Sequence, residues 1–486
     1  MTTERGVAPA ATRIERDSMG EMEVPRDALY GASTQRAVLN FPISGERFPR
    51  AFIRALALVK QAAAETNLEL GLLDARVATA IRDAAAAVAA GAHDDEFPID
   101  IYQTGSGTST NTNMNEVIAT LATRALAGSP GAAAGADGAS APARVHPNDH
   151  VNRCQSSNDT IPTALQLSAA MTIADDLIPA LEALRAALAA KADELWPVVK
   201  TGRTHLQDAT PIRLGQEFRG YAGQVEESIR RGRAAIDELT VVPLGGTAVG
   251  TGINAHPDYA AGATRRLSDL TGLDVREAHN HFHAQATLDV AIAAHGAVRA
   301  IALSLWKIGS DVRLMGMGPR AGLAEIALPE TQPGSSIMPG KVNPVIVESL
   351  TMVVARVIGN DATVAFGQTG SLLELNVMLP VTAAALLESI RLLAAAARNF
   401  ADRCVAGIAA TDRGPALVEQ GLMLATALAP EIGYDAAASL AKEALKTGRT
   451  IRELAAERGI AADRLDDLLD PAAMTEPGLE SGPAGG

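Results

Sequence analysis

Long stripes of apolar residues, spaced three and four apart, constrain this chain more than any other feature of its sequence. From 51 to 92 leucine, isoleucine and valine recur at this spacing with alanine in the gaps, which predicts helices. A longer stripe follows the segment "SSNDTIP", where Asp159 or Thr160 is the expected helix cap. Similar stripes cover about 212–240, 284–315, 342–366 and 377–404.

Five long helices of this kind cannot bury their apolar stripes singly, so we expect them to associate as an elongated bundle. Alanine is frequent on these faces, which allows close approach, and a remaining apolar face is expected to meet another copy of the chain. Residues 408–470 carry shorter helical patterns broken by Gly433 and Gly448. A flexible Ala/Gly/Ser insertion is expected at about 127–143, and the C-terminal tail is expected to be disordered.

The charge balance argues against a nucleic-acid surface and against a basic membrane footprint. In 486 residues, 42 Lys and Arg stand against 56 Asp and Glu, which gives a net charge of −14. The sequence has neither a run of about 18 apolar residues nor an apolar leader at its N-terminus. We therefore expect a cytoplasmic protein with a small-molecule partner, in which Cys154 and Cys404 are buried free thiols.

Four polar segments interrupt the aliphatic pattern, and chemistry is expected there. They are "TGSGTSTNTNMNE" at 104–116, "HPNDHVNRCQSSND" at 146–159, "GRTHLQDATP" at 202–211 and "GSSIMPGKVNP" at 334–344. All four offer hydroxyl, amide or basic groups that can bind a carboxylate. Each alone also has a structural interpretation: a helix cap for the first two, a structural histidine for the third, and a connecting loop for the fourth. The fold of one or several chains must bring them together.

The segment "HNHFH" at 279–283 offers a competing interpretation, because three alternating histidines could bind a transition metal. No Cys, Asp or Glu stands at ligand spacing beside them. We therefore expect a solvated loop, and no metal site is predicted.

The order of the motifs carries a family resemblance over about residues 12–470. In chain order they are "EVPRDALYGASTQRA", "GSGTSTNTNMNE", "HPNDHVN", "QSSND", "GRTHLQDATP", "GGTAVGTGIN" and "GSSIMPGKVNP". This series resembles the fumarase/aspartase superfamily. Within it the closest pattern is that of class II fumarases. Aspartases typically have alanine, asparagine, threonine and glutamine where this chain has Ser106, His146, Ser157 and His205.

The resemblance implies a mainly α-helical subunit of three domains. They are an N-terminal domain at 1–153, a central five-helix bundle at 154–407 and a small C-terminal domain at 408–486. Four subunits are implied to pack their bundles into a twenty-helix core, with each active site shared by three chains. No metal or organic cofactor is implied.

The resemblance further implies the reversible hydration of fumarate to L-malate through an aci-carboxylate intermediate. Ser335 is the implied general base, although Ser336 stays open, and His205 with Glu348 nearby is implied to handle the water. The implied substrate contacts are Ser106, Thr108, Ser156, Ser157, Asn158, Thr204, Lys341 and Asn343. A second dicarboxylate site at His146, Asn148 and Asp149 is left open. Two other functions also stay open: an ammonia lyase that binds the substrate carboxylate through the same residues, and a purely structural role.

Overall fold

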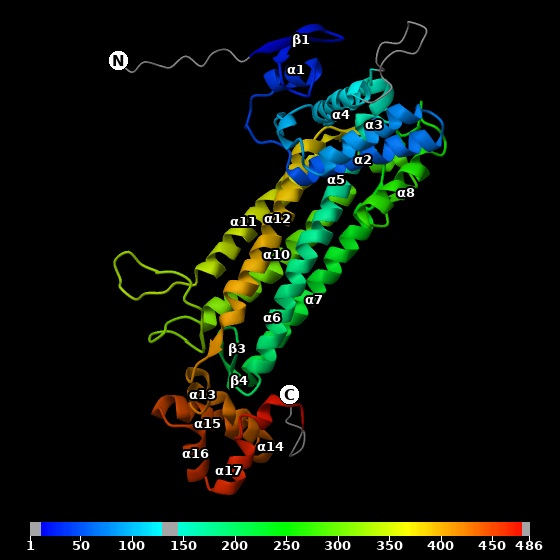
Figure 1. Ribbon diagram of the computed structural model, residues 1–486. Helices are drawn as coiled ribbons and strands as arrows, with labels where there is room; N and C mark the ends of the chain where they lie inside the picture. Colours follow the sequence, from blue (N-terminus) through cyan, green and yellow to red (C-terminus); the bar gives the residue numbers. More distant parts are fainter. Residues whose placement is uncertain (1–10, 129–143, 479–486) are drawn as a thin grey trace, which may run out of the picture. The chain divides into compact units, whose positions relative to one another are not determined.

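The structure of this chain is a computed structural model that describes residues 11–128 and 144–478 (Figure 1). The predicted insertion lies outside these residues from 129 to 143, and the predicted tail lies outside them from 479 onward. The chain is mainly helical, as predicted, and divides into two compact units, which we describe separately. Unit 1 comprises 1–178, 231–300 and 356–392, and unit 2 comprises 179–230, 301–355 and 393–486.

The predicted long helices are present with bounds within a few residues of those expected. They are α5 (Ser157–Thr172), α6 (Ile178–Glu194), α7 (Leu214–Leu239), α10 (Asp289–Met315), α11 (Val345–Gly367) and α12 (Leu379–Arg403). A single π-helical turn at Ile173–Leu177 separates α5 from α6, where one continuous helix was expected. The boundaries between the units fall inside α6, directly after its first residue, and inside α7, α10, α11 and α12.

Unit 1 contains the N-terminal elements and the short elements between the long helices. Their bounds are β1 Thr12–Asp17, β2 Gly20–Pro25, α1 Ala32–Asn40, α2 Arg50–Glu69, α3 Ala75–Ala89, α4 Thr108–Gly128, β5 Val241–Val242, α8 Tyr259–Thr271, β6 Arg276–Glu277, α9 His281–Ala286, β8 Ser371–Leu372 and β9 Leu375–Asn376. Helix α2 packs against α3, α5 and α8, and α3 packs against α4 (Figure 1).

Helix α2 shows why these residues form a core. Pro49 precedes its first residue with an extended backbone, and Phe52, Leu56 and Val59 recur at helical spacing and are completely buried. The alanines at 62–64 are buried as well, so that neighbouring helices can approach the α2 backbone closely. The same face also buries Lys60 completely, which the apolar pattern did not predict.

Unit 2 contains the C-terminal helices, which match the short helical patterns expected at 408–470. The bounds of its short elements are β3 Val199–Thr204, β4 Gln207–Arg213, β7 Ile326–Ala327, β10 Ala409–Ala410, α13 Arg413–Val418, α14 Ala429–Ile432, α15 Tyr434–Thr447, α16 Ile451–Glu457 and α17 Ala462–Leu468. Gly433 lies between α14 and α15, and Gly448 ends α15 in a left-handed conformation. Both glycines therefore break the helices where the sequence predicted.

The described strands form two-stranded sheets only. Four pairs are antiparallel, namely β1–β2, β3–β4, β7–β10 and β8–β9, whereas β5 and β6 pair in parallel. The segment "HNHFH", predicted to be a loop, instead begins helix α9 at His281. The reason is that the side chain of Asn280 accepts a hydrogen bond from His283 N–H and caps the helix.

Large apolar side chains remain exposed on α10 and α11. They are Leu303, Trp306, Leu314, Met352, Ile358 and Phe366. By length and composition, α10 and the stretch Leu379–Gly407 could also cross a membrane, but core helices of soluble proteins pass the same test. Cys154 and Cys404 are buried and free, as predicted. The three-domain division stays a prediction.

Candidate active site

The polar segment at 104–108 forms a turn in front of α4. The Ser106 and Thr108 hydroxyl oxygens lie 2.8 Å apart, so one donates a hydrogen bond to the other. Gly105 lets this turn dock onto the segment before α12, because its carbonyl accepts a hydrogen bond from Leu379 N–H at 3.0 Å. A Cβ at Gly105 would collide with the carbonyl oxygen of Val377. The glycine is thus needed for close backbone approach.

The second polar segment ends in the cap of α5. Ser156 is the cap residue, and not Asp159 or Thr160 as predicted. The prediction was wrong because the carboxylate of Asp159 reaches back to Ser156 N–H at 2.9 Å, while the Ser156 side chain accepts from Asn158 N–H at 3.3 Å. This reciprocal arrangement is a capping box, so the helix begins at Ser157.

Asp159 also holds the segment at 245–249 against the start of α5. Its second carboxylate oxygen accepts the backbone N–H groups of Gly245 at 3.0 Å and Thr247 at 2.9 Å. Asn158 donates its side-chain N–H to the carbonyl of Ala248 at 2.8 Å. The "GGTAV" segment therefore belongs to the wall of this site, a role that the motif order alone did not reveal.

The "HPND" segment forms one π-helical turn, Pro147–Val151, with His146 as its cap. The Nδ1 atom of His146 accepts the N–H groups of Asn148 and Asp149 at 3.2 and 3.1 Å. Asn148 and Asp149 line a hollow of about 350 Å³, together with Arg153 and Ser156. The segment and the cap of α5 thus share one depression in unit 1.

The third polar segment is a β-hairpin, which the sequence did not predict. Thr204 at the end of β3 pairs with Gln207 at the start of β4, so the turn contains only His205 and Leu206. Both turn residues have positive φ, 54° and 59°. Two-residue hairpin turns of type I′ require this conformation at both positions and usually place Asn and Gly there. Here the strained positions hold an exposed imidazole and an exposed leucine at the tip.

A buried ion network supports this hairpin. The carboxylate of Glu325, just before β7, lies 2.8 Å from Arg203 and 3.0 Å from the ammonium of Lys200. Lys200 also donates to both oxygens of Glu217 at 3.0 and 3.1 Å. The side chains of Lys200 and Glu325 are only 2% and 1% exposed. The network joins β3 to the segment that leads into the loop at 334–344.

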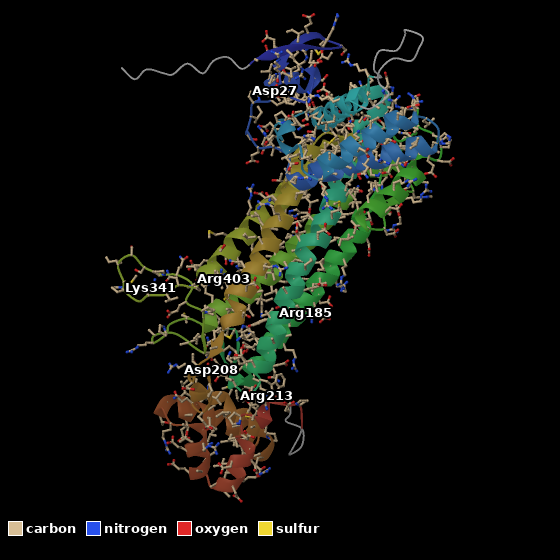
Figure 2. All side chains as sticks on the ribbon, in the orientation of Figure 1. Asp27, Arg185, Asp208, Arg213, Lys341 and Arg403 are labelled. Carbon is tan, nitrogen blue, oxygen red and sulfur yellow. The ribbon has the colours of Figure 1, made fainter. Side chains whose placement is uncertain are left out.

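The fourth polar segment is a loop whose two ends, Gly334 and residues 341–343, are joined by hydrogen bonds at what we call the loop neck. Gly334 N–H donates to the carbonyl of Lys341 at 2.8 Å, and Asn343 donates its side-chain N–H to the carbonyl of Gly334 at 2.5 Å. Lys341 is exposed on this loop (Figure 2). Glu348, in the first turn of α11, is exposed as well.

Within this loop the two serines differ in their surroundings. Ser335 Oγ accepts the backbone N–H groups of Ile337 and Met338 at 3.2 and 2.8 Å. Ser336 is exposed, and within the described part of the chain its hydroxyl has no hydrogen-bond partner.

The sequence-predicted residues thus fall into two groups. Unit 1 brings together Ser106 with Thr108, Ser156 with Ser157 and Asn158, and His146 with Asn148 and Asp149. Unit 2 places Thr204 and His205 on one hairpin, and Ser335, Lys341 and Asn343 on one loop ahead of Glu348. Each group is consistent with binding an anionic ligand through hydrogen-bond donors.

Comparison with known proteins shows what this chain resembles. It matches the family described as "Lyase" over residues 20–359 and that described as "Fumarase C C-terminus" over 424–476. It is 50% identical to a class II fumarate hydratase of Methylorubrum extorquens, covering 96% of this chain and 98% of that relative. It is 52% identical to one from Halobacterium salinarum, with coverage of 97% and 98%. The crystal structure of a class II fumarase from Schistosoma mansoni superposes with a TM-score of 0.90 at 38% identity, covering 96% and 99%.

Proposed function

Because this chain belongs to the class II fumarate hydratase family of lyases, we propose that it catalyses the reversible hydration of fumarate to L-malate. In the direction of dehydration, a weakly acidic proton must leave the carbon next to a carboxylate. The electrons then move into that carboxylate, which becomes a dianionic aci-carboxylate. Stabilising this added charge is the principal demand on the site.

The environment of Ser335 is the observation that carries the proposal. A serine is a poor base in water, but two backbone N–H groups aimed at its oxygen favour the alkoxide. The hydroxyl of Ser336 accepts no such bonds within the described residues. This contrast supports Ser335 as the general base.

The same loop supplies the charge that the intermediate needs. We assign the aci-carboxylate to the ammonium of Lys341 and to the second side-chain N–H of Asn343, whose first N–H closes the loop neck. His205 acts on the departing or attacking water, with Glu348 setting its protonation. The strained hairpin tip supports this role for His205, because unfavourable backbone conformations cluster at functional positions.

The hydroxyl and amide groups of unit 1 would orient the substrate. They are Ser106, Thr108, Ser156, Ser157 and Asn158, and unit 2 adds Thr204. The cap of α5 is suited to a carboxylate because it combines hydroxyl donors with the positive end of a helix dipole. We further propose that the hollow beside His146, Asn148 and Asp149 is a second dicarboxylate site, since its Arg153 can balance the carboxylate of Asp149.

We propose that the chain works in the cytoplasm as a homotetramer with a twenty-helix core, in which each active site takes residues from three subunits. The exposed apolar side chains on α10 and α11 support assembly, because monomers rarely leave so many large apolar groups in water. The three-domain division belongs to the same proposal.

The test is an absorbance assay of fumarate formed from L-malate and, separately, from L-aspartate, with and without a chelator. We expect turnover of L-malate only, unchanged by the chelator. Ser335→Ala should lower kcat at least a hundredfold with little change in KM, whereas Ser336→Ala should stay within a few-fold of wild type. Turnover of L-aspartate instead would make the protein an ammonia lyase, and a large loss confined to Ser336→Ala would move the base by one residue.

A further inference from the structure

A lysine ammonium lies completely buried beneath the cap of α5. Lys60, on α2, has no exposed surface and donates hydrogen bonds to the side-chain oxygens of Asn152 at 3.0 Å and Gln155 at 2.9 Å. Neither partner carries a charge. Burial lowers the pKa of Lys60 to about 7, and the carboxylate of Asp159 opposes that effect only in part. Burying such a group is costly, so a role beyond packing is needed to explain it.

The hydrogen bonds of Lys60 continue into a chain of side chains. The side-chain oxygen of Asn152 accepts from Lys60 and also from the amides of Asn111 and Asn115, both at 3.2 Å. Its own amide nitrogen donates to the carbonyl of Gln155 at 3.0 Å. Three donors on one oxygen fix which way this amide faces, because its nitrogen could accept none of them.

The amide of Asn111 is fixed in turn. It has two N–H groups, one directed at Asn152 and the other at the hydroxyl oxygen of Ser157, 3.0 Å away. A serine hydroxyl has a single proton and accepts through its oxygen. Because Asn111 can only donate here, the proton of Ser157 must point elsewhere. Ser157 is therefore set up as a donor at the start of α5.

We propose that Lys60 is a positioning residue that holds Ser157 as a hydrogen-bond donor to a substrate carboxylate. Asn152 and Asn111, which lie between them, transmit the orientation. Lys60 keeps the side-chain amide of Asn152 from flipping. The identity of the ligand rests on the proposed function, whereas the orientation of the hydroxyl rests on the contacts alone. The ligand class is a dicarboxylate held at the α5 cap.

The test is a double-mutant cycle on Lys60 and Ser157. Lys60→Met keeps an unbranched side chain that is one atom shorter, and it removes the hydrogen-bond donors. We expect KM for L-malate to rise about tenfold with a smaller change in kcat, the size of one hydrogen bond to a charged group. In a Ser157→Ala background the same change should alter KM less than twofold, because no hydroxyl is left to orient.

Two further variants keep the test decisive. Lys191→Met removes another buried lysine, whose partners are Glu194 and the carbonyl of Ile408, and it should leave KM unchanged. Asn111→Leu removes the donor to Ser157 directly and replaces Lys60→Met if that variant fails to fold. It should raise KM by a similar factor. The inference would be overturned if Lys60→Met, or Asn111→Leu in its place, changed KM equally with and without the Ser157 hydroxyl, or did not change KM at all.

A binding measurement separates this inference from the proposed function. Calorimetric titration with succinate, a dicarboxylate that cannot be dehydrated, needs no turnover. If wild type does not turn over L-malate, the proposed function fails, and the weaker succinate binding expected for Lys60→Met still tests the inference. If wild type is active but binds succinate no better than Lys60→Met does, the positioning role fails alone.

Discussion

The buried amine of Lys60 should make the stability of this protein depend on pH. Its pKa is about 7 in the folded chain because of burial, whereas an exposed lysine in the unfolded chain titrates near 10.4. Between these values the unfolded chain holds a proton on this amine that the folded chain has released. The free energy of unfolding therefore rises with pH across this window. The cost of burying the ammonium is fully present below about pH 7 and absent above about pH 10.

The magnitude follows from the two pKa values. They differ by about 3.4 pH units, and at about 1.36 kcal/mol per unit the whole effect is about 5 kcal/mol. Unfolding a chain of 486 residues carries an entropy of about 1 kcal/mol/K at about 2.1 cal/mol/K per residue. The contribution of this one group should thus raise the unfolding temperature by about 5 °C over the full window, and by about 2 °C between pH 7 and pH 9, because the folded-state amine is already half deprotonated at pH 7.

The assay is differential scanning calorimetry of wild type and Lys60→Met at pH 7, 8 and 9, at equal protein concentration. Other groups titrate in both proteins, so the informative quantity is the difference between the two unfolding temperatures. Lys191→Met is the matched control, because Lys191 is also buried but its ammonium is paired with the Glu194 carboxylate at 2.7 Å. A difference that stays constant from pH 7 to pH 9, or that changes equally in the control, would refute the reasoning.

Three further outcomes are expected. Glu325→Gln leaves the buried ammonium of Lys200 with a single carboxylate, and should lower the free energy of unfolding by about 3 kcal/mol in urea titrations. An unchanged urea midpoint would show that the buried ion network does not stabilise the fold. Gly334→Ala places a Cβ 2.5 Å from the carbonyl that closes the loop neck, and should lower kcat in steady-state assays without moving its pH profile. If the proposed shared sites exist, mixed assemblies of inactive Ser335→Ala and inactive His205→Asn subunits should regain part of the activity, whereas none would return if each site used one chain only.

The long helices could be predicted from the sequence because the spacing of apolar residues decides them almost alone. The observed α7, α11 and α12 begin and end within a few residues of the predicted ranges. The turn between α5 and α6 was missed because the apolar stripe continues through it, although Pro179 directly after the turn has no N–H for a helical hydrogen bond.

The local details of the site could not be predicted, because long-range contacts decide them. Ser156 caps α5 because Asp159 is held by backbone groups about 86 residues further along the chain. The hairpin that presents His205 lacks the Asn-Gly signal of its turn, so no local pattern marked it. Lys60 and Lys200 interrupt apolar patterns as surface residues also do, and only the fold shows that both are buried.

Trp306 gives the protein an optical reporter of its own assembly. The chain has only two tryptophans, and the side chain of Trp306 is 47% exposed on the apolar face of α10. The other indole, that of Trp196, lies under the guanidinium of Arg219 at 4.3 Å, within unit 2. If a neighbouring subunit covers α10, dilution that separates the subunits will move the emission of Trp306 to longer wavelengths. Intrinsic fluorescence would then follow the association equilibrium with no label attached.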